Sequence, residues 1–319
     1  MNKAGVAGLG AMGRHHVRVY HELGVLGAVC DTDASIAKEL GEKYQVPWFE
    51  DVETMLGTVN LDCMSIATPT QTHYPLARLC LEYSLPVLVE KPICDNLQDA
   101  SALLTMAQNA KTIIAVGYIE RFNPAFRALC SLIQREQLGE IISIHVKRVG
   151  GTPRSADNVI LDLMTHDLDL ALSLFGETPD YIVTSQHARD TLVNAAQCLL
   201  QFGSASVTCE ANWISPVKIR RWEVTGTLGY CEVDLITQKI IFFNPTISAS
   251  VSSFSDFVLQ YGEPSHQVMV NFRREPLKDE LAEFLVAVTT GKTENIVTVE
   301  NSLQTLSVTL QAMGEDNVR

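Results

Sequence analysis

Residues 4–14 read AGVAGLGAMGR, a short apolar run followed by three glycines with the spacing G-x-G-x-x-G. A helical pattern covers residues 14–23, so the order is strand, glycine turn and helix, which is typical of a dinucleotide-binding site. In this interpretation Gly8 permits the tight turn, Gly10 lets the backbone approach a pyrophosphate, and Gly13 lets helix and strand pack closely. The residues predicted to bind the cofactor phosphates, at the helix N-terminus, are Gly8, Gly10, Ala11, Met12 and Gly13.

The next predicted strand, residues 26–30, ends in Asp31, which lies 18 residues after Gly13. An acidic residue at this distance typically binds the adenosine ribose hydroxyls. None of the four residues after Asp31 is an arginine that could receive a 2′-phosphate, so NAD is favoured over NADP. An alternative makes Asp31 and Asp33 ordinary turn and cap residues before the helix at 34–44. We assign the ribose to Asp31 and the cap to Asp33.

The chain has 319 residues, 46% of them hydrophobic, which favours two well-cored domains. Its net charge of −13 argues against a nucleic-acid or anionic-membrane surface. No apolar run approaches a membrane span, and the N-terminus leads directly into a strand, so we expect a cytoplasmic protein. Eight cysteines form no C-x-x-C pair, so we expect buried free thiols and neither a disulfide framework nor a metal site.

Strands and helices alternate strictly to about residue 120, which predicts an α/β fold with an N-terminal doubly wound parallel sheet. Ligands of such sheets bind beyond the carboxyl ends of the strands. Thr68, Lys91 and Tyr118 all follow predicted strands in this way. The cofactor residues predicted at these ends are Thr68, Glu90 and Lys91.

After residue 120 the pattern changes to two helices and a run of strands, and the chain ends in helices at 275–290 and 299–312. This predicts a C-terminal α+β domain with a large, mainly antiparallel open sheet. We place the NAD-binding domain at 1–120 and the substrate and oligomerisation domain at 121–319, and the terminal helices could pack back on the first domain. An open sheet face needs a cover, so we expect a homodimer or homotetramer through it.

Oxidation of an alcohol by hydride transfer needs a base for the hydroxyl proton and a donor beside the developing carbonyl. Lys91 follows a buried strand and suits the second role, although an ion pair with Glu90 explains it equally well. Pro92 could fix the turn, with either peptide isomer.

A second group of polar residues lies on the helix predicted at 159–175. Asp162 and His166 are four residues apart, so a carboxylate can orient an imidazole that acts as a general base. The alternatives are a helical polar cluster that includes Asp169, or a metal pair, for which no further ligand is suitably spaced. His15, His16 and His21 fit a solvated helix face.

The segment 117–124 joins the two domains, and its polar side chains could contact a ligand. Arg121 suits a carboxylate or phosphate, but it could equally pair with Glu120 or another acid. Asn123 could contact substrate, cap the following helix, or do both. Arg148 and Arg154 could form one wall of the site. The residues predicted to bind substrate are Lys91, Tyr118, Arg121, Asn123, Arg148 and His166.

Together these motifs resemble the Gfo/Idh/MocA family of NAD(P)-dependent oxidoreductases over essentially the whole chain. The resemblance rests on the glycine turn, Glu90-Lys91-Pro92, the segment 117–124 and Asp162-x-x-x-His166-Asp167. It implies a catalytic trio of Lys91, Asp162 and His166, with His166 as acid/base. The segments at 118–124 and 162–169 look most similar to members that act on sugar nucleotides, which implies a UDP-sugar as the small-molecule substrate. Inositol or a free sugar, redox-neutral glycoside cleavage, and a catalytically silent NAD-binding regulator are the alternatives.

Overall fold

The computed structural model describes residues 3–151, 158–189, 192–243, 266–270 and 273–315. The chain forms two compact units. The first comprises residues 1–119 and 275–307, and the second comprises residues 120–274 and 308–319. Each unit has its own β-sheet and its own hydrophobic core.

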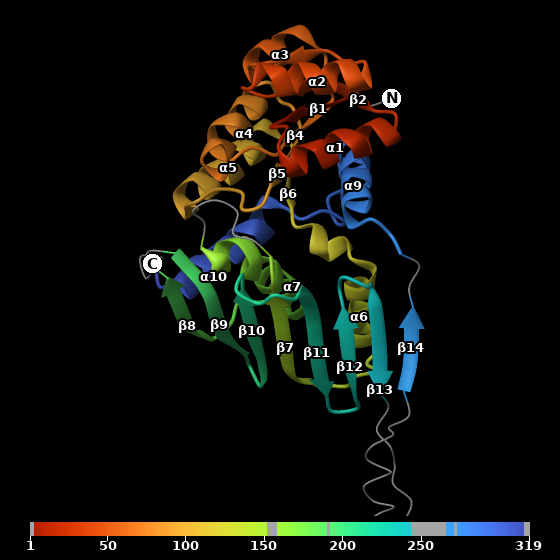
Figure 1. Cartoon of the computed structure of the whole chain (residues 1–319), viewed down its shortest axis with the longest axis vertical. Helices are drawn as coiled ribbons and strands as arrows, with labels where there is room; N and C mark the ends of the chain where they lie inside the picture. The colour runs from red at the N-terminus through yellow and green to blue at the C-terminus, as the bar shows by residue number, and fades with distance from the viewer. Residues whose placement is uncertain (1–2, 152–157, 190–191, 244–265, 271–272, 316–319) are drawn as a thin grey trace, which may run out of the picture. The chain divides into compact units, whose positions relative to one another are not determined.

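In the described part of the first unit, six parallel strands form a sheet with the order β3-β2-β1-β4-β5-β6 (Figure 1). The strands are β1 (Ala4–Ala7), β2 (Leu26–Cys30), β3 (Trp48–Phe49), β4 (Cys63–Ile66), β5 (Val87–Glu90) and β6 (Ile114–Gly117). The helices between them are α1 (Ala11–Glu22), α2 (Ala34–Tyr44), α3 (Val52–Thr58), α4 (His73–Glu82) and α5 (Leu97–Ala110). This confirms the predicted doubly wound fold.

Side-chain caps fix where several of these helices begin. Asp33 accepts hydrogen bonds from the backbone N–H groups of Ser35 and Ile36 at the start of α2, as predicted. Asn96 Oδ1 accepts the Asp99 N–H at 2.8 Å at the start of α5. Helix α1 instead begins three residues earlier than predicted, because Gly10 already occupies the N-cap position.

The core of the first unit also includes a helix from the far end of the sequence. Helix α9 (Pro276–Thr290) places Leu281 and Phe284 in the same buried cluster as Val6 and Val17. Residues from the first strand and from the last fifth of the chain therefore share one core.

The second unit contains an eight-stranded sheet in its described residues, with the order β14-β13-β12-β11-β7-β10-β9-β8. Neighbouring strands are antiparallel except β10 and β7. The strands are β7 (Ile141–Val149), β8 (Tyr181–Arg189), β9 (Leu192–Phe202), β10 (Ala205–Asn212), β11 (Ile219–Gly226), β12 (Gly229–Asp234), β13 (Lys239–Phe243) and β14 (His266–Val270). The mainly antiparallel sheet confirms the prediction, and β14 is an edge strand that the sequence pattern did not reveal.

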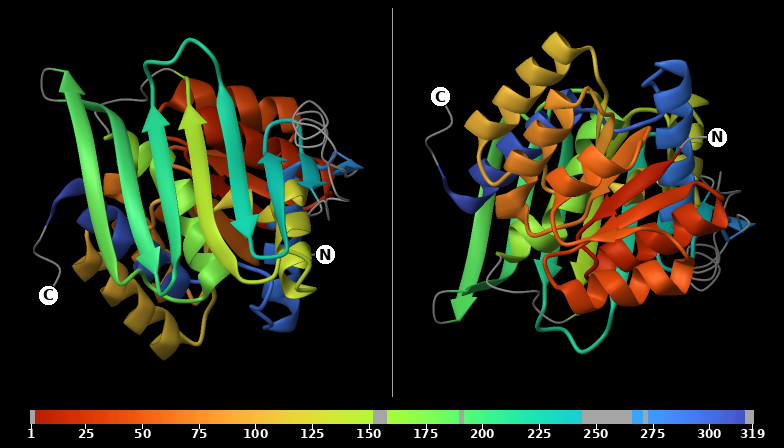
Figure 2. Two further views of the ribbon diagram at one scale, coloured as in Figure 1. Left: turned by 90° about the horizontal axis from the view of Figure 1, so that it is seen from below. Right: turned by 90° about the horizontal axis from the view of Figure 1, so that it is seen from above.

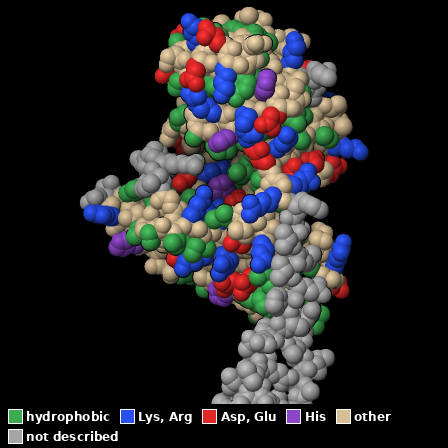
Figure 3. Space-filling view, turned by 45° about the vertical axis from the view of Figure 1, so that its right-hand side comes forward, with side chains coloured by type: hydrophobic (Ala, Val, Ile, Leu, Met, Phe, Trp, Pro, Cys, Tyr) green, Lys and Arg blue, Asp and Glu red, His purple; other side chains and the backbone are tan. Residues whose placement is uncertain are grey.

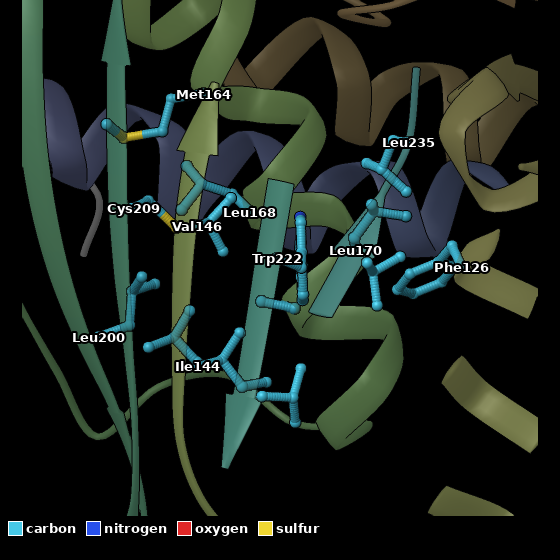
Figure 4. Packing of buried hydrophobic residues seen from close by; sticks show 14 of the residues in the cluster. Phe126, Ile144, Val146, Met164, Leu168, Leu170, Leu200, Cys209, Trp222 and Leu235 are labelled. Atoms are coloured by element: carbon cyan, nitrogen blue, oxygen red, sulfur yellow. The ribbon is translucent and has the colours of Figure 1, made fainter. Parts of the chain in front are cut away.

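Helices α6 (Pro124–Gln134) and α7 (Thr165–Phe175) pack against this sheet, and Figure 2 (left) shows α7 behind the strands. Buried side chains from β7, β9, β10, β11 and the helices point into the layer between them (Figure 4). At its centre Trp222 is fully buried, and its ring meets Phe126 edge-on at 5.8 Å between centroids. The opposite face of the sheet carries exposed side chains, among them Tyr181 and Val183.

The helix predicted at 159–175 has an irregular first turn. Residues Ile160–Met164 form a π-helical turn, called η3, and α7 follows without a break. A helix of 3-10 type, η2 (Ile119–Phe122), precedes α6, and the last helix, α10, spans Val299–Met313. Single π-turns occur frequently at functional sites, and this one contains Asp162.

The eight cysteines are free, and seven of them are buried. On the face drawn in Figure 3, basic and acidic side chains are interspersed over the described surface. None of the described helices has the length and apolar character needed to cross a membrane.

Candidate active site

The glycine turn at the end of β1 has the geometry that its spacing predicts. Gly8 has φ +83°, and a Cβ at that position would lie 2.6 Å from the Ala67 carbonyl oxygen. A Cβ on Gly13 would lie 1.7 Å from the carbonyl oxygen of Gly8. A Cβ on Gly10, in contrast, would have no neighbour within 4 Å. Gly8 and Gly13 are therefore required by packing, whereas Gly10 leaves open space beside the first turn of α1.

The first N–H groups of an α-helix, here beginning at Ala11 and Met12, have no intrahelical acceptor. Together with the open space at Gly10 they form a cradle for a phosphate group. The structure thus fits the pyrophosphate of a dinucleotide at the predicted residues.

Asp31 lies directly after β2 and braces this turn. Its Oδ2 accepts the Leu9 N–H at 2.7 Å, and its Oδ1 accepts the Asp33 N–H at 2.9 Å. Each carboxylate oxygen can accept a further hydrogen bond, so Asp31 can also bind ribose hydroxyls.

An arginine does lie near Asp31, although the sequence around Asp31 shows none. Arg14 comes from α1, and its Nη1 lies 3.2 Å from Glu39 Oε1 on α2. The Glu39 hydrogen bond, with a smaller contribution from Asp31, raises the pKa of Arg14. Among the described residues, Arg14 is thus an arginine beside Asp31, and its exposed ion pair with Glu39 competes with any 2′-phosphate there.

The carboxyl end of β5 carries Glu90, Lys91 and Pro92, and the Lys91–Pro92 peptide bond is cis. Glu90 is 8% exposed, and its Oε1 lies 2.9 Å from Nε2 of His16. His16 is fully buried, so the prediction of a solvated position was wrong for this histidine. Lys91 is partly exposed.

His73, the first residue of α4, connects two strand ends. Its Nδ1 lies 2.8 Å from the Pro92 carbonyl oxygen, and its Nε2 lies 2.9 Å from the Thr68 carbonyl oxygen. Burial lowers the pKa of this imidazole. The sequence pattern did not single out His73 as part of the site.

In the second unit, Asp162 and His166 are both partly exposed. Trp213 donates its indole N–H to Asp162 Oδ2 at 3.3 Å. This tryptophan is 51 residues away in the sequence, so no local pattern could associate it with Asp162. The roles predicted for Asp162 and His166 stay predictions.

Two acids that follow His166 on α7, Asp167 and Asp169, bind arginines. Asp167 receives Arg148 Nε at 2.6 Å and Nη2 at 2.9 Å, and Arg148 Nη1 donates to Glu120 at 2.9 Å. Asp169 receives Nε and Nη2 of Arg121, both at 2.7 Å. Burial disfavours the charge on Arg148, but Asp167 and Glu120 outweigh this effect and raise its pKa.

Arg121 and Arg148 were predicted to contact substrate, and the structure gives both a partner inside the unit. For Arg121 the alternative of an ion pair with another acid is confirmed. Asn123 caps α6 through the Ala125 N–H, and its Nδ2 donates to the Leu235 carbonyl oxygen at 2.9 Å. Substrate contacts of these three residues stay predictions.

Tyr118 follows β6 and is 1% exposed, and its predicted contact with substrate is not tested. Arg154 lies outside the described residues. A cation that the sequence analysis missed is Arg220, whose Nη1 donates to the Val149 carbonyl oxygen at 2.6 Å. Burial and the nearby Arg148 lower the pKa of Arg220 to about 10. Among the described residues no three His, Cys, Asp or Glu side chains are grouped to hold a metal ion.

Comparisons with known proteins identify the family. Residues 2–118 match an oxidoreductase family with an NAD-binding Rossmann fold, and residues 126–232 match the C-terminal domain of the same family. The chain belongs to the Gfo/Idh/MocA family. The family match and the glycine turn agree on NAD as the cofactor.

Two members of the family show how far the similarity extends. UDP-N-acetylglucosamine 3-dehydrogenase from Acidithiobacillus ferrooxidans is 36% identical over 179 residues, which is 56% of this chain and 55% of that protein. Its structure aligns over 98% of this chain and 97% of its own, with a TM-score of 0.86 and 26% identity. The scyllo-inositol 2-dehydrogenase (NAD(+)) of Bacillus subtilis is 26% identical over 94% of this chain and 90% of that protein.

A third structure concerns the cofactor. An oxidoreductase from Agrobacterium radiobacter, solved in complex with NAD+, L-tartaric acid and magnesium, aligns over 100% of this chain and 97% of its own. The TM-score is 0.82 at 17% identity, so this similarity concerns the fold.

Proposed function

We propose that this chain is an NAD-dependent dehydrogenase that oxidises a sugar hydroxyl to a ketone, with C3 of UDP-N-acetylglucosamine as the favoured position. The observation that carries the proposal is the similarity to UDP-N-acetylglucosamine 3-dehydrogenase, which extends in structure over 98% of the chain. The cradle at Gly10 and the carboxylate of Asp31 support the binding of NAD.

The residue roles follow from the chemistry of the reaction. NAD, when bound, accepts the hydride. His166 takes the hydroxyl proton as general base, and Asp162, itself held by Trp213, stabilises the imidazolium that results. The Lys91 ammonium donates to the hydroxyl oxygen as the carbonyl develops.

The substrate diphosphate needs cationic or N–H partners on a chain whose net charge is −13. Arg121 binds Asp169 through two N–H groups, whereas the buried Arg148 binds Asp167 and Glu120 through three. A guanidinium has five donors, so Arg121, the more exposed of the two, retains N–H groups for a phosphate, and this is the role we propose for it.

A second candidate substrate is an inositol. The scyllo-inositol dehydrogenase of Bacillus subtilis is similar over 94% of this chain, a longer aligned stretch of sequence than that of the sugar-nucleotide enzyme.

We also propose the domain roles and the assembly. Residues 1–120, together with residues 275–307 of the same compact unit, form the NAD-binding domain. The rest of residues 121–319 forms the substrate domain, whose open sheet face joins copies into a homodimer or homotetramer. Tyr181 and Val183 on that face are 50% and 59% exposed, and burial of their apolar area would stabilise the contact with a second copy. A monomeric mass in solution would contradict the assembly. A cytoplasmic location stays a prediction.

The experiment is absorbance of reduced nicotinamide with purified protein, NAD or NADP, and a panel of UDP-sugars, free sugars and inositols. We expect a signal with NAD and UDP-N-acetylglucosamine. A signal with inositol alone would favour the second candidate. Silence across the panel with NAD binding intact would contradict both and favour redox-neutral glycoside cleavage or a regulator.

The base assignment is tested by His166→Asn, which removes the proton acceptor but keeps a polar side chain. We expect a loss of turnover of at least about 10²-fold, with the dissociation constant for NAD unchanged. His21→Asn, at the exposed end of α1, is the matched control. Turnover at the wild-type rate in the His166 variant would exclude His166 as the base.

A further inference from the structure

Two buried histidines approach the segment Glu90–Pro92 from two different helices of the first unit. His16 lies on α1 and is fully buried, and His73 begins α4 and is 1% exposed. An imidazole placed in a protein core is unfavourable unless its nitrogens are hydrogen-bonded. At both positions an apolar side chain would fill a buried site without this requirement, so the contacts that the two rings make call for an explanation.

His73 bridges the ends of neighbouring parallel strands. Pro92 lies two residues beyond β5, and Thr68 lies two residues beyond β4. The two ring nitrogens lie 2.8 and 2.9 Å from their carbonyl oxygens, and a neutral ring donates its single N–H to one of them. Thr68 is tied to the same helix start a second time, because its Oγ1 accepts the Thr72 hydroxyl at 2.8 Å. The backbone that follows Lys91, at Pro92, is therefore linked through His73 to Thr68 at the end of β4, which we expect to contact NAD.

His16 contacts Glu90, the residue that precedes Lys91. Its Nε2 lies 2.9 Å from Glu90 Oε1. A Cβ added to Gly117 would lie 3.1 Å from the Glu90 carboxyl group, so that carboxylate packs directly on the backbone of β6. Tyr20, one turn after His16, has its hydroxyl 2.8 Å from Ser65 Oγ on β4. Helix α1, which follows the glycine turn, is thus tied by buried polar contacts to two strands of the sheet.

We infer that His16 and His73 are positioning residues for Lys91: they hold its two neighbours, Glu90 and Pro92, and so determine where the lysine ammonium is presented. Neither histidine needs to touch substrate or cofactor. The inference rests on the proposed function only for the chemical role of Lys91, and the geometry that it concerns lies entirely within the first unit.

The test uses a pair of variants that separates the two contacts of His73. The amide of Asn occupies the position of the imidazole Nδ1, and the amide of Gln occupies that of Nε2, so His73→Asn retains the Pro92 contact and His73→Gln retains the Thr68 contact. The first readout is pulsed acetylation, followed by mass spectrometry, of Lys91 relative to the exposed Lys111, measured across pH. The second is kcat and the KM for NAD in the assay of the proposed reaction.

For His73→Gln we expect the Lys91:Lys111 labelling ratio to change by about threefold or more, because amine reactivity follows the local environment. We expect kcat to fall about tenfold or more, because small misplacements of reacting groups are costly, with little change in the KM for NAD. His73→Asn should keep both values within about threefold of the wild type. Equal labelling ratios in the wild type and both variants would overturn the inference.

His16 provides a second pair if the His73 variants do not fold. His16→Gln keeps a donor at the position of Nε2 and His16→Leu removes it, so only the Leu variant should change the Lys91 labelling ratio. Thermal unfolding of all four variants distinguishes a shift at Lys91 from a general loss of stability. Because the labelling needs no substrate, it decides the inference even if UDP-N-acetylglucosamine fails as the substrate and the proposed function falls.

Discussion

Replacing two glycines of the same turn by alanine should have opposite consequences. At Gly13 the new Cβ would lie 1.7 Å from the carbonyl oxygen of Gly8 and 2.8 Å from its carbonyl carbon. Both are backbone atoms, so the turn itself has to move. At Gly10 the new Cβ meets nothing within 4 Å, and its φ of −70° suits alanine.

The magnitudes follow from these contacts. Overpacking costs about 1–3 kcal/mol of stability when side chains can adjust. At Gly13 the clash is with backbone atoms, so we expect Gly13→Ala to lower the free energy of unfolding by at least about 3 kcal/mol. For a unit of this size that loss lowers Tm by roughly 6–12 °C. For Gly10→Ala the poorer N-cap and the reduced entropy of the unfolded chain oppose each other, which leaves a change of about 0.5 kcal/mol or less. The added methyl group, however, fills the space that we assign to the pyrophosphate, so NAD affinity should fall at least about tenfold, or 1.4 kcal/mol.

The assay combines thermal unfolding without ligand and calorimetric titration with NAD. Gly10→Ala should unfold like the wild type and bind NAD weakly, and Gly13→Ala should unfold early. Wild-type NAD affinity in Gly10→Ala would refute the placement of the pyrophosphate beside Gly10. Equal losses of Tm in the two variants would refute the packing argument.

Three further predictions concern charges. Asp167→Asn leaves Arg148 buried with one carboxylate fewer, so the free energy of unfolding measured in urea should fall by about 3–5 kcal/mol. The double variant Asp167→Asn with Arg148→Met should lose less free energy of unfolding than the single variant. Burial raises the pKa of five cysteine thiols from 9.0 to about 12, so the folded state holds these protons more tightly than the unfolded state does. The free energy of unfolding should therefore fall as pH rises from about 9 towards 12, and a thiol reagent at pH 8 should label the seven buried thiols only after denaturation. Glu39→Gln removes the carboxylate that pairs with Arg14, so the KM for NADP should fall up to about fivefold while the KM for NAD stays unchanged. The limit of about fivefold follows because an exposed ion pair contributes at most about 1 kcal/mol. An unchanged KM for NADP would argue that Glu39 does not restrain Arg14.

Much of the fold could be predicted because its signals are local. The glycine turn, the caps Asp33 and Asn123, and the buried runs of the parallel strands each depend on a few neighbouring residues. The run of strands after residue 120 likewise predicted the second domain and its open sheet. Strand β14 was missed because its five residues pair with β13 alone at the edge of the sheet.

The site was less predictable because its contacts are long-range. His16 stands among polar residues on α1, and the reason for its burial, Glu90, lies 74 residues further along the chain. The partners of Arg121 and Arg148 lie 48 and 19 residues away, and a sequence shows only that acids are available. The π-turn at Ile160–Met164 was likewise not predicted.

The place of α9 in the first core also bears on how the protein folds during synthesis. Leu281 and Phe284 complete a cluster that begins at Ala4, but they are translated about 165 residues after β6, roughly 8–33 s later at ribosomal rates. During that interval the apolar face that α9 will cover stays available to chaperones. A fragment that ends near residue 119 would keep this face uncovered permanently, so it should associate with itself, and α9 supplied as a separate peptide should restore its solubility.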